Sequence, residues 1–303
     1  MKPRDIALAC LTSVIWGLAF VAIRFGLESF SPPQLTALRF VIACLPALVL
    51  PRPAVSWPML ITTGLFLFAG QFLLLFFAYA YGMPAGLASV TQQMQALFTV
   101  LLAATFLRDR PTPRQAAGLI VAFCGLGLIA LTIGGDLTRV GLGLALAAAF
   151  SWAIGNVLVK RIGRVDMPAL MAWLSIVPPI PALLVSHFTN PAGPSIIAAI
   201  AGSSWASLLA VVYIGGAATV LAYAIWGSLL ARYPAAAVAP FALLAPCTGV
   251  VASALMLGER FSPIRYAGMA LVIAGLACIV VPHHIVRAWW TSGRAAHRWR
   301  FRQ

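Results

Sequence analysis

Two apolar segments of the chain carry aromatic, amide and cationic side chains at helical spacing. The residues are Trp16, Phe20 and Arg24 in the first segment and Trp152, Asn156 and Lys160 in the second. Because each set recurs every four residues, a helix places its members on one face. Aromatic faces accept an ammonium group by cation–π attraction, and amides orient polar groups by hydrogen bonding. The pattern indicates a binding site for a small polar solute.

Three further apolar segments supply polar candidates for the same site. These are Gln71 in one segment, Ser89, Gln92 and Gln93 in another, and Tyr223 and Trp226 in a third. Helical spacing puts Thr99 on the same helix face as Ser89, Gln92 and Gln93, whereas Thr91 and Gln95 point away from that face. A buried Gln can line a binding site or bond only to a neighbouring helix, and both interpretations stay open.

The composition indicates a membrane protein. Of 303 residues, 62% are apolar and 9% are charged, whereas a soluble domain carries about a quarter charged residues. A helix needs about 20 apolar residues to cross a bilayer. The sequence offers ten such runs, at 6–25, 34–50, 58–81, 84–107, 114–133, 140–159, 167–188, 205–231, 235–257 and 264–282. They lack the period-2 alternation of membrane barrels, so we expect an all-α integral membrane protein with ten transmembrane helices.

Inside a membrane, the tryptophans and cations each allow two interpretations. Trp16 and Trp152 would lie near mid-depth, where they either line a cavity or simply pack. Arg24 and Lys160 would lie toward opposite mouths of the site. There they either attract a substrate carboxylate or anchor their helices by reaching the interface.

Prolines predict breaks in two of the runs. They are Pro178, Pro179 and Pro181 in the seventh run and Pro240 and Pro246 in the ninth. A proline inside a helix removes a backbone hydrogen bond and frees a carbonyl, such as that of Ala242. We expect a kink in the seventh run. In the ninth, the break is either a hinge or a place where carbonyls face a wet cavity.

The net charge of +14 follows from membrane topology. If the N-terminus is cytoplasmic, most Lys and Arg residues fall in cytoplasmic loops, so both termini should lie in the cytoplasm of a bacterial-type inner membrane. The tail 284–303 is rich in Arg and Trp, which is also typical of nucleic-acid-binding segments. Because it follows a helix on the cytoplasmic side, we expect it to bind anionic lipid head groups and no nucleic acid.

One segment of the chain occurs twice. Residues 106–129 read FLRDRPTPRQAAGLIVAFCGLGLI, and residues 256–279 read MLGERFSPIRYAGMALVIAGLACI. Weaker similarity extends upstream, which predicts two five-helix repeats at 1–135 and 136–283 before the tail. A unit with an odd number of spans enters the membrane the second time from the opposite side. We therefore expect inverted repeats around a central cavity, the arrangement by which secondary transporters expose one site to each side in turn.

The repeated helix also repeats its glycines. They stand at 118 and 125 in the first copy and at 268 and 275 in the second. Small residues on one side of a membrane helix allow close packing within the chain, and a homodimer contact is the alternative.

The chain resembles the drug/metabolite transporter superfamily, in particular its ten-helix EamA-type exporters, which include cysteine/O-acetylserine and YddG-like amino-acid exporters. The resemblance rests on WGLAFVAIRFGL (16–27), GMPAGLASVTQQMQALFTVLL (82–102), AAAFSWAIGNVLVKR (147–161) and YAIWGSLLARYPAAAVAPFALLAPCTG (223–249). It implies the fold and export of small metabolites. Gln93 and Gln95 match the cysteine-exporter pattern, whereas Gln92 replaces an apolar residue.

Missing residue types narrow the mechanism. All acidic residues and histidines fall at expected helix ends or in loops, so no intramembrane proton relay is expected. No Lys or Arg is expected at mid-depth, which argues against substrates that need a phosphate clamp. No nucleophile–base pair, phosphate loop or metal-ligand spacing occurs, so we expect neither an enzyme nor a cofactor or metal.

The prediction is a secondary transporter that exports small amino acids or related metabolites by alternating access, through facilitated diffusion or exchange. An exporter of other small amphipathic solutes or drugs is the alternative, and an intramembrane enzyme or scaffold is a distant third.

Overall fold

The computed structural model describes residues 1–106, 111–163, 165–189 and 191–280. These ranges are helical apart from their connections and one isolated β-bridge between Gly134 and Leu137. Within them, nine helical stretches are long and apolar enough to cross a membrane, and the shorter apolar helix Pro32–Leu48 accompanies them. The predicted all-α membrane fold is confirmed.

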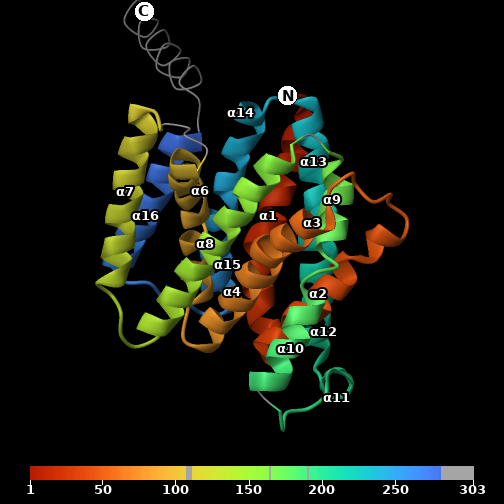
Figure 1. The fold of residues 1–303 in the computed structure, drawn as a ribbon. Coiled ribbons are helices and arrows are strands. Elements are labelled where there is room, and N and C mark those ends of the chain that lie inside the picture. The colour runs from red at the N-terminus through yellow and green to blue at the C-terminus, as the bar shows by residue number, and fades with distance from the viewer. Residues whose placement is uncertain (107–110, 164, 190, 281–303) are drawn as a thin grey trace, which may run out of the picture.

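The spans follow one another through the bundle in Figure 1. The first half holds α1 (Pro3–Gly26), α2 (Pro32–Ala43) with η1 (Leu45–Leu48), α3 (Trp57–Gly64) with η2 (Leu65–Gly70) and α4 (Gln71–Ala80), α5 (Ala85–Thr91) with α6 (Met94–Phe106), and α7 (Pro113–Ala130). The second half holds α8 (Arg139–Ile162), α9 (Met167–Leu174) with α10 (Pro179–Thr189), α12 (Trp205–Val212) with η3 (Tyr213–Leu221) and α13 (Ala222–Arg232), α14 (Ala235–Val238) with η4 (Ala239–Leu243) and α15 (Leu244–Met256), and α16 (Pro263–Val280). A short helix, α11 (Ile196–Ala201), precedes α12.

Local sequence signals set several helix ends. Ser31 before α2 and Thr112 before α7 each form a capping box with a glutamine three residues later, and each helix has a proline in its first turn. Thr138 caps α8 by accepting a hydrogen bond from the Gly141 amide. The same helix ends at Gly163, whose φ of 83° is a conformation that glycine adopts without strain.

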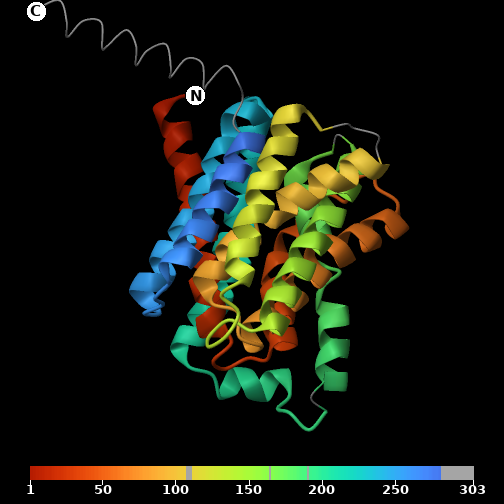
Figure 2. The ribbon, with the colours of Figure 1, turned by 90° about the vertical axis from the view of Figure 1, so that its left-hand side faces the viewer.

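The helices α7 and α16 cross in opposite directions through their glycines. A Cβ on Gly118 would lie 2.7 Å from the Gly275 carbonyl oxygen, and one on Gly125 would lie 2.6 Å from that of Gly268. The sequence repeat pairs Gly118 with Gly268, whereas the structure puts Gly118 against Gly275. This crosswise contact is what a two-fold axis between inverted repeats produces, and Figures 1 and 2 show the two helices side by side. The glycines therefore pack within the chain rather than at a dimer contact.

Other helix pairs exchange partners in the same way. Helix α1 packs along α15, and its repeat counterpart α8 packs along α6. The counterparts α2 and α10 pack against each other. Each half thus contributes to the surroundings of the other.

Two corresponding spans contain π-helical segments, η2 in the third and η3 in the eighth. Such segments insert a residue into the backbone ladder and often occur at functional sites. Two further corresponding spans are broken, one at Gln92–Gln93 between α5 and α6 and one in the 3₁₀ segment η4.

The proline predictions are confirmed in the seventh span and at Pro240, whereas Pro246 lies in the first turn of α15, which continues past it. The seventh span is interrupted between Leu174 and Pro179, and η4 includes Pro240. Next to the carbonyl of Ala242, the Phe241 carbonyl oxygen accepts the Leu244 N–H within η4 and a second hydrogen bond from Ser13 Oγ at 2.8 Å. Helix α1 thus stabilises the break in the ninth span.

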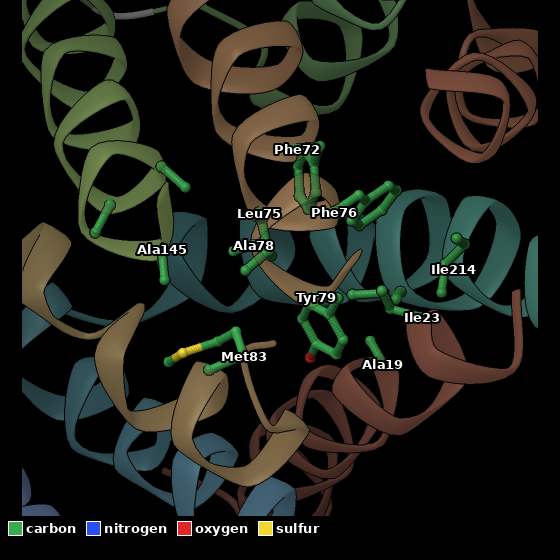
Figure 3. Packing of buried hydrophobic residues seen from close by; sticks show 14 of the residues in the cluster. Ala19, Ile23, Phe72, Leu75, Phe76, Ala78, Tyr79, Met83, Ala145 and Ile214 are labelled. Atoms are coloured by element: carbon green, nitrogen blue, oxygen red, sulfur yellow. The ribbon is translucent and has the colours of Figure 1, made fainter. Parts of the chain in front are cut away.

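The buried core is aromatic and aliphatic. In Figure 3, Tyr79 of α4 lies beside Ala19 and Ile23 of α1, and its hydroxyl donates to the Phe20 carbonyl oxygen at 3.0 Å. Large apolar side chains also cover the outside, and Trp205 and Leu255 are about four-fifths exposed. An apolar exterior over an apolar core is expected where lipid replaces water.

Candidate functional site

Three of the predicted site residues lie together between α1 and α13. The Trp16 ring centroid is 5.6 Å from that of Tyr223 and 5.1 Å from that of Trp226. The indole N–H of Trp16 donates to the Ala218 carbonyl oxygen at 3.1 Å. We call Trp16, Tyr223 and Trp226 the aromatic cluster.

The π-helical segment η3 explains how a tryptophan is satisfied there. An inserted residue shifts the backbone ladder and leaves carbonyl oxygens available to side chains. Trp16 uses that of Ala218, and Thr219 Oγ1 donates to that of Ile214 at 2.8 Å. A buried indole N–H needs such a partner, so the irregular backbone of η3 positions the cluster.

The cluster continues into the first half of the chain. The ring centroid of Tyr223 lies 6.3 Å from that of Phe68 in η2. The Phe68 centroid in turn lies 5.0 Å from that of Phe40 in α2 and 6.5 Å from that of Phe72 in α4. The π-helical segment η2 therefore contributes one ring, Phe68, to a run that reaches α13 of the second half.

Arg39 lies at the far end of these rings, and it corrects the expectation of no cation at mid-depth. It stands about halfway along Pro32–Leu48 and is 4% exposed. Its guanidinium carbon lies 3.7 Å from the Phe72 ring centroid, and its Nε donates to Thr219 Oγ1 at 3.2 Å. The prediction was wrong because the helix Pro32–Leu48 is short, so Arg39 lies near its middle and is buried inside the bundle.

Asn156 lies apart from the aromatic cluster. Its Nδ2 donates to Gln95 Oε1 at 2.7 Å and to Thr99 Oγ1 at 3.3 Å, which joins α8 to α6. Helical spacing predicted that Gln95 and Thr99 point in different directions, and this prediction was wrong. Gln95 is the polar residue that helical spacing missed.

The other polar candidates come from the third and fourth spans, and all of them except Gln93 are buried. Gln92 donates through Nε2 to the Ala145 carbonyl oxygen at 3.2 Å, and its Oε1 is buried without a partner, as is that of Gln71. Ser89 Oγ bonds to the carbonyl oxygens of Gly86 and Pro246. Gln93 is half-buried. Unpaired amide oxygens in a core are costly, so Gln71 and Gln92 retain capacity for a ligand or water.

The remaining candidates are partly buried or exposed. Phe20 and Trp152 are partly buried against the core, and Trp152 has no counterpart to the Trp16 cluster among the described side chains. Arg24 and Lys160 are exposed in the last turns of α1 and α8. The two halves therefore share a backbone plan but differ in their polar chemistry.

Charged contacts join elements at the two ends of the bundle. Asp5 at the start of α1 pairs with Arg232 at 2.9 Å and accepts from the Tyr233 hydroxyl at 2.8 Å. The Glu259 carboxylate accepts the amides of Ala85 and Gly86 at 2.7 and 2.9 Å.

A further ion pair lies on the connection between α7 and α8. Arg265 of α16 contacts Asp136 at 2.8 Å. The hydrogen bond from Arg265 is the main reason that the pKa of Asp136 lies below its ordinary value.

The fold and site together define a multi-pass membrane protein built from two similar halves, with its polar groups gathered inside the bundle. A model of the EamA-like transporter family matches residues 4–131 and 139–281, and the chain belongs to this family. The family assignment makes the protein a membrane transporter and not an enzyme, as predicted.

Curated relatives cover nearly the whole chain. A protein of Salmonella typhimurium named a probable amino-acid metabolite efflux pump is 39% identical over 97% of this chain and 100% of its own. One of the same name from Escherichia coli is 38% identical over 91% of this chain and 94% of its own. A probable terminal-alkyne amino-acid exporter of Streptantibioticus cattleyicolor is 29% identical over 89% and 91%.

The fold also matches a solved structure. A crystal structure aligns with a TM-score of 0.61 at 20% identity, over 92% of this chain and 96% of that one. This likeness supports the architecture alone.

Proposed function

We propose that the protein exports small amino acids or closely related metabolites across the cytoplasmic membrane. The observation that carries the proposal is the aromatic cluster between the two halves, with its rings continuing to a buried cation. Aromatic faces suit an ammonium group and a guanidinium suits a carboxylate. The names of the relatives as amino-acid metabolite efflux pumps point to the same solutes.

The site also includes the polar residues named from the sequence. Gln71 supplies an amide from the third span, Gln92 and Gln93 supply amides at the break of the fourth span, and Ser89 and Asn156 stabilise the surrounding helices. Arg24 and Lys160 attract the solute at the mouths. Phe20 and Trp152 complete the walls.

Export proceeds by alternating access of the two halves. The crosswise glycine contact of α7 with α16 gives the halves a two-fold relation, and inverted repeats of this kind rock around a central site. The breaks in corresponding spans supply places for bending. The described acidic residues lie at helix ends or connections, so the cycle is facilitated diffusion or exchange without an intramembrane proton relay.

The membrane arrangement follows the charge distribution. Both termini face the cytoplasm, with repeats at 1–135 and 136–283. The basic tail 284–303, Asp109 and residues 281–283 lie outside the described residues. The tail binds anionic lipid head groups, and the protein binds no nucleic acid.

Counterflow in proteoliposomes tests this function. Vesicles preloaded with one unlabelled amino acid, without a pH or voltage gradient, should accumulate the labelled amino acid transiently, whereas protein-free vesicles should not. A panel of amino acids identifies the preferred side chain. Absence of counterflow for every amino acid, with folded protein in the vesicles, would reject the proposal and favour other amphipathic solutes or drugs as substrates.

A further inference from the structure

A buried arginine in the fold has no acidic partner among the residues that the structure describes. Arg39 is 4% exposed, and the ion pairs of the described residues involve Arg232 and Arg265 instead. A cation inside a membrane protein is costly unless something compensates its charge, so it marks a functional site by default.

The contacts of Arg39 satisfy only part of its guanidinium. Phe72 covers one face of the group at 3.7 Å, and Nε donates to Thr219 Oγ1 at 3.2 Å. Neither Nη nitrogen donates a hydrogen bond to a described residue. These nitrogens form the planar fork that binds a carboxylate through two parallel bonds.

The neighbours of Arg39 come from both halves of the chain. Phe72 belongs to α4, and Thr219 belongs to the π-helical segment η3. Thr219 in turn donates to the Ile214 carbonyl oxygen, so the inserted turn of η3 holds the hydroxyl in place for Arg39. An anion bound to Arg39 would therefore contact the interface between the halves.

The aromatic rings connect this cation to the aromatic cluster. The ring centroid of Phe68 lies 5.0 Å from that of Phe40 and 6.3 Å from that of Tyr223. The Tyr223 ring in turn contacts Trp16. The site thus has a cationic end for an anion and an aromatic end for an ammonium group or an apolar side chain. These two ends complement the two charges of a zwitterion.

We propose that Arg39 is the anchor for the substrate carboxylate, which serves as the missing counter-ion of the guanidinium. This inference rests on the proposed function and specifies its substrate class as solutes with a free carboxylate. A neutral or cationic drug without that group would leave the buried cation unpaired and would bind weakly.

A purely structural role for Arg39 leads to a different expected result of its replacement. The stacking on Phe72 and the bond to Thr219 would then only hold α2, α4 and η3 together. Replacing such a residue changes stability without changing the preference for a carboxylate. The preference itself is therefore the informative readout.

The experiment compares an amino acid with its own primary amide, which keeps the ammonium group and side chain but lacks the carboxylate. The amino acid chosen for the comparison is the one that counterflow identifies as the best substrate. Binding is measured by thermal shift of the purified protein and by competition in counterflow. Wild type should prefer the amino acid roughly ten- to a hundredfold, the value of a charged hydrogen-bonded pair. Arg39→Gln should reduce the preference to about one, while Arg39→Lys should retain part of it.

Arg139→Gln is the matched control, because Arg139 is an exposed arginine at the start of α8 and should keep the wild-type preference. A wild-type preference that survives in Arg39→Gln overturns the anchor while the export function stands. If Arg39→Gln does not fold, the comparison uses wild type and Arg39→Lys alone. Equal binding of the amino acid and its primary amide by wild type then overturns the anchor. Failure of wild type to exchange any amino acid overturns the proposed function and the anchor together.

Discussion

Among single residues, Trp16 links the aromatic cluster to the backbone of η3. Its indole N–H bonds to the Ala218 carbonyl oxygen, and its ring contacts both members of the cluster on α13. Trp16→Phe keeps an aromatic ring but leaves that carbonyl unpaired, at a cost of about 1–3 kcal/mol. We expect a lower unfolding temperature and a several-fold higher KM in counterflow.

Trp205→Phe is the control for this change, because Trp205 is 81% exposed and should behave as wild type. Equal behaviour of the two variants would show that the indole hydrogen bond contributes nothing measurable.

Sequence spacing predicted the residues of the aromatic cluster but not its cation. Trp16, Tyr223 and Trp226 were recognisable because they lie at helical spacing with other candidates inside apolar runs. Arg39 was misplaced because a single arginine near the start of an apolar run looks the same whether its helix is long or short. Gln95 was missed because regular helical spacing does not account for the turn at Gln92–Gln93.

Between elements, the glycine contact of α7 with α16 has a built-in comparison. A Cβ on Gly125 would lie 2.6 Å from the Gly268 carbonyl oxygen and 2.8 Å from the Val272 nitrogen, whereas a Cβ on Gly127 meets nothing within 4 Å. Gly125→Ala should therefore push the helices apart and destabilise the protein by about 1–3 kcal/mol. Gly127→Ala should be neutral or slightly stabilising.

Thermal unfolding of the two variants in detergent measures this difference. Similar unfolding temperatures would mean that α7 and α16 are not packed through these glycines. The crosswise glycine contact would then no longer support a two-fold relation between the halves.

The order of the spans was predictable because nine of the described spans are long apolar runs, and the second, Pro32–Leu48, is a shorter one. The proline breaks were predictable as well. The π-helical segments and the break at Gln92–Gln93 were not, since none of them is marked by proline in the sequence. They depend on partners far along the chain, such as Ser151, which donates to the Phe66 carbonyl oxygen at 2.7 Å.

For the whole molecule, two carboxylates join the halves at opposite ends of the bundle. Asp5 of the first half holds Arg232 and Tyr233 of the second. Glu259 of the second half holds the first amides of α5 in the first half. The start of α1 lies at the top of Figure 1, whereas α5 begins at the other end, just after α4. Under the proposed alternating-access cycle, we expect these two contacts to open at different times.

Hydrogen–deuterium exchange in nanodiscs can separate the two ends. Asp5→Asn should raise exchange in the first turn of α1 and the last turn of α13, because a neutral amide holds Arg232 less strongly. Glu259→Gln should raise it in the first turn of α5, where loss of a charged cap costs roughly 0.5–2 kcal/mol. Each change should leave the opposite end near its wild-type rate. If both variants raise exchange at both ends equally, the ends are coupled as one unit and do not open in turn, which would contradict the proposed cycle.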